Sequence, residues 1–83
     1  MSTTYAVLGS GMQGTAAAYD LAKFAQAEAI KLGDLSLEQA SKAASRVNQL
    51  VGTHVCTAQK VDALDPSSVG AFLDGVQVLL SCV

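Results

Sequence analysis

The chain has 83 residues, of which 51% are hydrophobic and 14% are charged, and its formal net charge is −2. This length supports one small domain with a single core. The scattered charges give no reason to expect a nucleic-acid or membrane partner, and the first apolar run is too short for a signal peptide or a membrane span. We therefore expect a cytoplasmic protein.

The first half of the chain alternates between strand and helix patterns. Residues 4–8 predict a short apolar strand, and a helical pattern begins at Met12. Residues 29–32 predict a second strand, although Lys31 interrupts its apolar run. A capping box at residues 36–39 then opens a second helix.

The second half continues the same alternation. Gly52 ends the second helix, and residues 54–58 predict a third strand. Asp65-Pro66 is a strong helix start, Gly75 ends that helix, and residues 76–83 predict a fourth, strongly apolar strand. Alternation of this kind predicts a parallel sheet with helices on its faces.

Between the first strand and the first helix stands a complete G-x-G-x-x-G motif. In such a loop the first glycine makes a tight turn, the second lets a pyrophosphate approach the backbone, and the third permits close helix packing. Amide groups at the helix N-terminus then bind the phosphate oxygens. The candidate phosphate-binding residues are Gly9, Ser10, Gly11, Met12, Gln13 and Gly14.

An acidic residue, Asp34, follows twenty residues after Gly14, at the end of the second strand. A carboxylate there accepts hydrogen bonds from an adenine ribose and repels a 2′-phosphate, so NAD is favoured over NADP. The alternative is that Asp34 only caps the following turn or helix. With this acid, the motif predicts a Rossmann-type three-layer α/β fold with three helices and a parallel sheet of order 3-2-1-4.

Two further residues are candidates for the same site. Asp62 follows the third strand, where it either contacts adenine or is a solvated loop acid, and Ser81 ends the fourth strand, where the nicotinamide half would lie. We expect no metal site, because His54 and the two cysteines lack a ligand spacing. Cys56 and Cys82 would lie three strand spacings apart, roughly 14 Å, and so should stay unpaired.

Three stretches of the chain resemble the saccharopine dehydrogenase family, which includes saccharopine reductases and lysine 6-dehydrogenase-like enzymes. They are YAVLGSGMQGTAAAYDLAKF, GDLSLEQASKAASRVNQL and VQVLLSCV, and the resemblance covers nearly the whole chain. It implies an NAD(P)-dependent oxidoreductase that acts on a CH–NH bond of an amino acid. Gly9, Gly11, Gly14 and Asp34 match the family's cofactor-binding positions.

Members of that family continue through further strands and a substrate domain, which carries the acid–base residues. We therefore expect residues 1–83 to be the N-terminal part of a dinucleotide-binding domain, without a catalytic residue and without activity alone. The alternative function is a non-catalytic NAD-sensing module, such as the regulatory Rossmann domains of ion transporters. The last strand would present an unpaired apolar edge, which predicts a homo-oligomer formed through it.

Overall fold

The structure, a computed structural model, describes residues 3–82 and follows the predicted order of alternating strands and helices. The four strands are all parallel and form one sheet in the order β3-β2-β1-β4, as the sequence predicts. The elements are β1 Thr4–Leu8, α1 Met12–Phe24, β2 Ala29–Asp34, α2 Leu37–Val51, β3 Cys56–Lys60, α3 Pro66–Leu73 and β4 Val78–Ser81.

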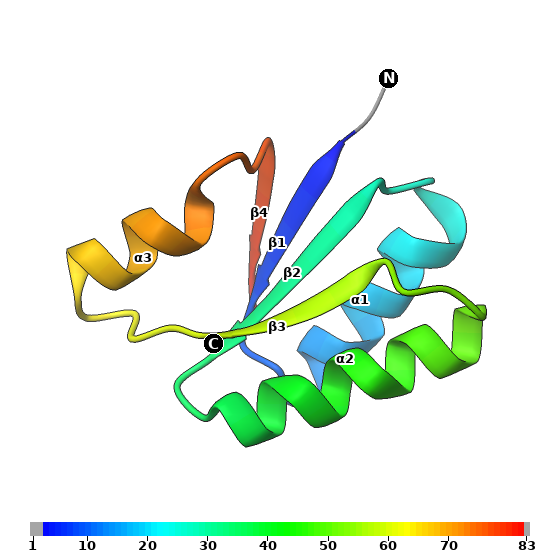
Figure 1. The fold of residues 1–83 in the computed structure, drawn as a ribbon, viewed down its shortest axis with the longest axis horizontal. Helices are drawn as coiled ribbons and strands as arrows, with labels where there is room; N and C mark the ends of the chain where they lie inside the picture. Colours follow the sequence, from blue (N-terminus) through cyan, green and yellow to red (C-terminus); the bar gives the residue numbers. More distant parts are fainter. Residues whose placement is uncertain (1–2, 83) are drawn as a thin grey trace.

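The helices form layers on both faces of the sheet. Helices α1 and α2 lie against one face, and α3 lies on the opposite side (Figure 1). Because the strands are parallel, their carboxyl ends meet at the same edge of the sheet. The loops that follow β1, β2 and β3 therefore emerge side by side, and this edge is where ligands bind in open α/β sheets.

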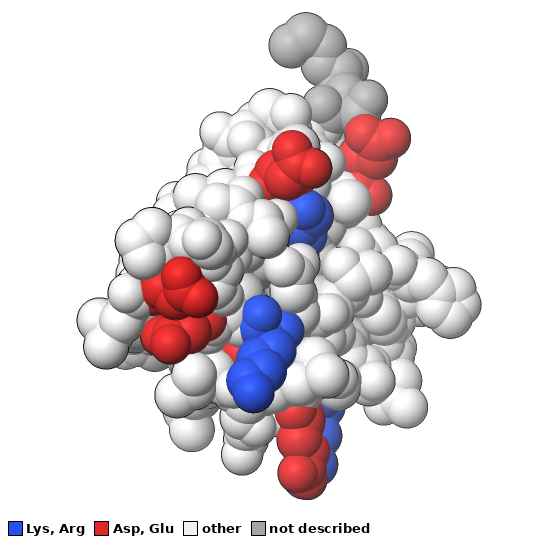
Figure 2. Space-filling model, turned by 60° about the vertical axis from the view of Figure 1, so that its left-hand side comes forward, with Lys and Arg blue, Asp and Glu red and all other residues white. Residues whose placement is uncertain are grey.

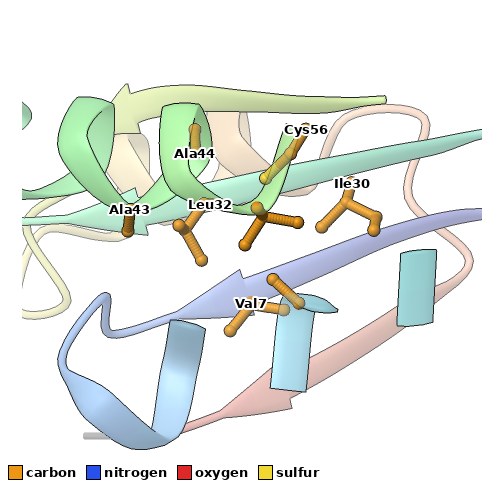
Figure 3. Close-up of a cluster of buried hydrophobic side chains, with 8 residues drawn as sticks. Val7, Ile30, Leu32, Ala43, Ala44 and Cys56 are labelled. Carbon is orange, nitrogen blue, oxygen red and sulfur yellow. The ribbon is translucent and has the colours of Figure 1, made fainter. Parts of the chain in front are cut away.

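The larger core lies between the sheet and helices α1 and α2 (Figure 3). Val7, Ile30 and Leu32 are fully buried there, and small side chains on α2 let this helix approach them closely. Burial of each of these three side chains stabilises the fold by about 1.5–3 kcal/mol. The buried residues of this cluster are Val7, Ala18, Ile30, Leu32, Ala43, Ala44, Val47 and Cys56.

A smaller core lies under α3, where Ala6, Val61 and Phe72 are buried. Gly33 of β2 lies directly beneath the Phe72 ring. A Cβ atom on Gly33 would lie 2.7 Å from Cζ of Phe72 and 2.8 Å from Cγ2 of Val61, closer than atoms in contact tolerate. Glycine at this position is therefore what allows the phenyl ring to rest on the sheet.

Lys31 does not end β2, although it interrupts the apolar pattern. Its Nζ atom donates hydrogen bonds to the carbonyl oxygens of Asp74, at 2.7 Å, and Phe72, at 3.4 Å. These carbonyls lie at the C-terminal end of α3, where a cation is favourable. The lysine thus joins β2 to the helix on its face.

Pairing between neighbouring strands gives β2 and β3 boundaries that differ from those the sequence predicts. Strand β2 continues past residue 32 to Asp34, and β3 begins at Cys56 instead of residue 54 and continues to Lys60. Asp34 and Lys60 are register partners, so the ladder extends through polar residues that an apolar pattern does not mark. Strand β4 is shorter than predicted, and residue 83 lies outside the described residues.

Helical spacing predicts that Gly14, Ala17, Leu21 and Phe24 form the inward stripe of α1, and the structure buries only part of this stripe. Gly14 and Ala18 are its buried positions, whereas Phe24, predicted to face inward, is 72% exposed. Phe24 is the last residue of the helix, where the chain leaves the sheet for the turn into β2. The predicted inward face of this helix is therefore wrong at its C-terminal end.

The two cysteines occupy different environments. Cys56 is buried beneath α2, Cys82 is half-buried, and both thiols are free. Burial raises the pKa of the Cys56 thiol to about 11, so this thiol is protonated at neutral pH. Between residues 3 and 82, no three His, Cys, Asp or Glu side chains are grouped closely enough to hold a metal ion. None of the helices in this range combines the length and the hydropathy that a membrane span requires.

Candidate functional site

The loop after β1 turns sharply at Gly9. This residue has φ +101°, in the left-handed region that favours glycine, and its amide donates to the Gly33 carbonyl oxygen at 2.8 Å. The turn is thereby tied to the end of β2. Gly11 is the N-cap of α1, with no side chain accepting from the helix and no acidic residue in its first turn. The free amides of this turn are available to an anion.

The remaining two glycines of the motif meet different requirements. A Cβ atom on Gly14 would lie 1.7 Å from the Gly9 carbonyl oxygen, so only glycine lets α1 lie this close to the turn. A Cβ atom on Gly11 would meet no atom within 4 Å. Packing within the chain therefore explains the glycine at position 14 and not the one at position 11.

The carboxylate of Asp34 joins the loop after β1 to the loop after β2. Its Oδ2 atom accepts from the Ser10 amide at 2.9 Å and from the Ser10 hydroxyl at 2.6 Å. Its Oδ1 atom accepts from the Ser36 amide at 3.0 Å. The hydrogen bond from the Ser36 amide closes an Asx turn, which is the turn-capping contact that the sequence left open as the alternative.

These hydrogen bonds also set the charge of Asp34. Donation by the Ser10 hydroxyl, and next by the Ser36 amide, stabilises the ionised form and holds the pKa of the Asp34 carboxyl below its usual range. The carboxylate is therefore ionised at neutral pH. It lies beside the glycine-rich loop, and a ligand bound across both loops would contact a fixed negative charge.

A cleft of about 240 Å³ opens next to Asp34, between the loops that follow β1, β2 and β3. Two leucines that the sequence analysis did not select lie along it: Leu35, which is 65% exposed, and Leu64, which is 93% exposed. The signal available in the sequence was an apolar residue in each of the loops that follow β2 and β3. The lining residues are Leu8, Gly9, Asp34, Leu35, Val61, Asp62, Ala63 and Leu64.

Asp62 and Ser81 take different places around this edge. Asp62 lines the cleft, but its carboxylate accepts from the Leu64 amide at 2.9 Å and so shapes the local turn. Ser81 is exposed at the end of β4 and is the register partner of Leu8. It lies on the other side of β1 from Asp34, outside the cleft.

The remaining loop residues, Met12 and Gln13, open α1 and are exposed to solvent. Among the residues that the structure describes, the charged ones that line the cleft are acidic, Asp34 and Asp62. On the α3 side of the molecule, basic and acidic side chains are dispersed over an otherwise uncharged surface (Figure 2). The cleft is therefore an apolar pocket with an acidic rim next to a row of helix amides.

Comparison with known proteins gives matches in structure. The quinate dehydrogenase from Corynebacterium glutamicum in complex with NAD superimposes with a TM-score of 0.80 at 17% identity, over 100% of this chain and 27% of that one. The menthone neomenthol reductase from Mentha piperita gives a TM-score of 0.81 at 22% identity, over 100% of this chain and 32% of that one. The chain has a Rossmann-type fold.

The predicted three-layer fold is thus confirmed. The chain spans 27% of the length of the quinate dehydrogenase chain and 32% of the length of the menthone neomenthol reductase chain. No protein-family model matches the sequence, and no curated protein matches it. The resemblance to saccharopine dehydrogenases in particular therefore remains a prediction. Identities this low show the fold, while the ligand has to be argued from the site itself.

Proposed function

We propose that this chain binds the adenosine and pyrophosphate of NAD, as the N-terminal segment of an oxidoreductase. The observation that carries the proposal is Gly11, an exposed glycine at the uncapped N-terminus of α1. Within residues 3–82, no neighbouring atom would obstruct a side chain at this position. A pyrophosphate bound to the helix amides would require a residue without a side chain at this position. The NAD-bound quinate dehydrogenase, which shares the fold, supports the same assignment.

Different residues of the site would bind the pyrophosphate, the adenine ribose and the adenine ring of the dinucleotide. The amides at the start of α1, from Gly11 to Gln13, bind the pyrophosphate, and the Asp34 carboxylate accepts from the adenine ribose. The apolar cleft between Leu35 and Leu64 takes the adenine ring, with Asp62 at its edge. Ser81 lies nearer the nicotinamide half, across β1.

Two acidic groups at the cleft favour NAD over NADP. A ribose 2′-phosphate would lie beside the ionised Asp34 carboxylate, and no cationic side chain lines this cleft. The nicotinamide ring supplies the hydride chemistry when the cofactor is bound. The resemblance to saccharopine dehydrogenases supports a CH–NH bond of an amino acid as the substrate of the whole protein, and the cytoplasmic location and homo-oligomer remain predictions.

Calorimetric titration with NAD and with NADP tests the proposal. The wild-type chain should bind NAD more tightly than NADP. Asp34→Ala should weaken NAD binding by about tenfold, which corresponds to about 1.4 kcal/mol, and should narrow the difference between the two dinucleotides. Asp20→Ala, which removes an exposed acid on the opposite end of α1, serves as the matched control and should bind like the wild type.

Two results would contradict this function. If neither dinucleotide binds to the folded wild-type chain, the cofactor assignment is wrong. If Asp34→Ala binds NAD as tightly as the Asp20→Ala control, the ribose assignment is wrong and Asp34 only caps the turn after β2.

A further inference from the structure

Ser10 is the buried polar residue of the glycine-rich loop, and the motif itself places no demand on this position. Ser10 as a whole residue is 5% exposed, and its hydroxyl and amide both donate to the same carboxylate oxygen, Oδ2 of Asp34. Its own carbonyl oxygen accepts from the Thr15 hydroxyl at 3.2 Å. Ser10 is therefore held on both sides, by α1 and by the end of β2.

The hydrogen bonds of Asp34 leave limited room for a ligand. An ionised carboxylate has about four lone-pair positions for hydrogen bonds. Ser10 fills the two on Oδ2, and the Ser36 amide fills one on Oδ1. The amide of Leu35 contributes more weakly to lowering the pKa of this carboxyl. Because Oδ2 accepts twice from Ser10, Oδ1 is the oxygen at which a donor from outside the chain would bind.

We infer that Ser10 is a positioning residue, which fixes the Asp34 carboxylate so that its Oδ1 atom is turned toward a ribose hydroxyl. The inference rests on the proposed function and assigns to it a residue that does not itself touch the ribose. The carboxylate plane is fixed by three donors from two loops, so it does not have to be ordered when the cofactor binds. Binding that requires no reorientation of a side chain loses less entropy.

The charged side chains near Asp34 do not orient its carboxylate in the way that Ser10 does. Lys60 is the register partner of Asp34 on β3, Asp62 lines the cleft, and Glu38 lies in the first turn of α2. Within residues 3–82, Lys60 forms no ion pair with Asp34, and the carboxylates of Asp62 and Glu38 can only repel that of Asp34. The hydroxyl of Ser10, with the two backbone amides, is thus what holds this carboxylate.

The test compares Ser10→Ala, which removes the hydroxyl, with Ser10→Thr, which keeps it. Thr15→Ala is the matched control, because it removes a hydroxyl of α1 that bonds the Ser10 carbonyl oxygen and leaves all three donors to Asp34 in place. Two quantities are measured on the whole chain: the dissociation constant for NAD and NADP by calorimetry, and the pKa of the Asp34 carboxyl by carbon-detected NMR titration without cofactor.

We expect Ser10→Ala to weaken NAD binding by about five- to tenfold and to raise the Asp34 pKa toward its ordinary value. NADP should still bind more weakly than NAD, because Asp34 keeps its charge at neutral pH. Ser10→Thr should restore both the affinity and the pKa, and Thr15→Ala should change neither. This pattern separates positioning from the direct loss of the acid in Asp34→Ala, which should also narrow the difference in affinity between NAD and NADP.

Three outcomes would overturn the inference. If folded Ser10→Ala binds NAD like the wild type, Ser10 only stabilises the loop. If Thr15→Ala weakens NAD binding as much as Ser10→Ala does, the effect belongs to loop order in general and not to the carboxylate. If the wild type itself binds no NAD, the proposed function fails together with any role of Ser10 toward a ribose, and this result is recognised before the variants are compared.

Discussion

Gly14 and Gly11 belong to one motif, but a side chain added at each would have opposite consequences. Gly14→Ala should destabilise the fold by about 3 kcal/mol or more, because the new Cβ atom would overlap the Gly9 carbonyl oxygen. Gly11→Ala should cost less than about 1 kcal/mol, because the space around this position is open. Urea unfolding followed by circular dichroism measures both changes.

Substitutions at Gly11 and Gly14 also separate effects on stability from effects on ligand binding. Gly11→Ala should keep the fold and still weaken NAD binding at least tenfold, because the added methyl group occupies the approach to the helix amides. A Gly11→Ala chain that binds NAD normally would show that this glycine has no ligand-related role. A Gly14→Ala chain as stable as the wild type would show that α1 can move away from the turn at little cost.

The Asp34 carboxylate makes stability depend on pH. Its hydrogen bonds hold the folded-state pKa below the ordinary value of 3.8, so the unfolded chain takes up the proton first as the pH falls. The stabilisation is therefore complete well above pH 3.8 and is lost as the pH falls through the lower folded-state pKa. Asp34→Asn should lower the free energy of unfolding by about 1–3 kcal/mol at pH 7, and this difference should shrink below pH 4.

Unfolding of the wild type and of Asp34→Asn across this pH range checks the expectation, with Asp20→Asn as the control. A difference between wild type and Asp34→Asn that stays constant from pH 7 to pH 3 would contradict it. In that case the carboxylate would contribute through its shape and not through its charge.

At the scale of elements, the three helices begin in different ways. The Ser36 hydroxyl accepts from the Gln39 amide at 3.2 Å, and the Asp65 carboxylate accepts from the Ser67 amide at 3.0 Å, so α2 and α3 each have a side-chain cap. Helix α1 has none, and Gly11 stands at its N-cap. The helix left without a cap is thus the one that faces the candidate site, where a bound phosphate would satisfy its amides.

Strand β2 and helix α3 are coupled through Lys31. Lys31→Met keeps the length of the side chain but removes the donor to two helix carbonyls, and should lower the free energy of unfolding by about 1–2 kcal/mol. Lys42→Met is the control, because Lys42 forms an exposed pair with Glu38 that is worth about 0.5 kcal/mol or less. Chemical denaturation of both variants makes the comparison, and equal effects would contradict the role of Lys31 as a cap.

At the scale of the whole molecule, β4 is an exposed edge strand of the sheet. Its residues Val78, Leu79 and Leu80 are 40%, 42% and 37% exposed, and among the described strands β4 pairs only with β1. An apolar edge strand without charges is a template for pairing with another chain. We therefore expect the isolated chain to self-associate through β4 at high concentration.

Leu79→Lys should shift this association toward monomer, because it places a charge on the edge strand. Leu37→Lys, at an exposed apolar site on α2, is the matched control and should leave the association unchanged. Size-exclusion chromatography with light scattering measures the mass of each variant. A wild-type chain that stays monomeric at high concentration would contradict the prediction, as would equal effects of the two variants.

Much of this architecture follows from local patterns in the sequence. The order of strands and helices, the glycine-rich loop and the caps at Ser36 and Asp65 each depend on residues within a few positions of one another. Hydrophobic periodicity and capping hydrogen bonds form within one or two turns of chain, so they can be predicted without knowing the fold. The sheet order follows from these patterns through the topology that such alternation allows.

Contacts between distant segments were decided only in three dimensions. Ser10 meets Asp34 across 24 positions, and Lys31 reaches Asp74 across 43. The sequence around Ser10 and Lys31 does not predict the hydrogen-bond partner of either residue, because that partner depends on how neighbouring strands align. By itself the sequence determined which edge of the sheet carries the candidate site, whereas the tertiary structure decided how the acid there is held, since hydrogen bonds need atoms within about 3 Å.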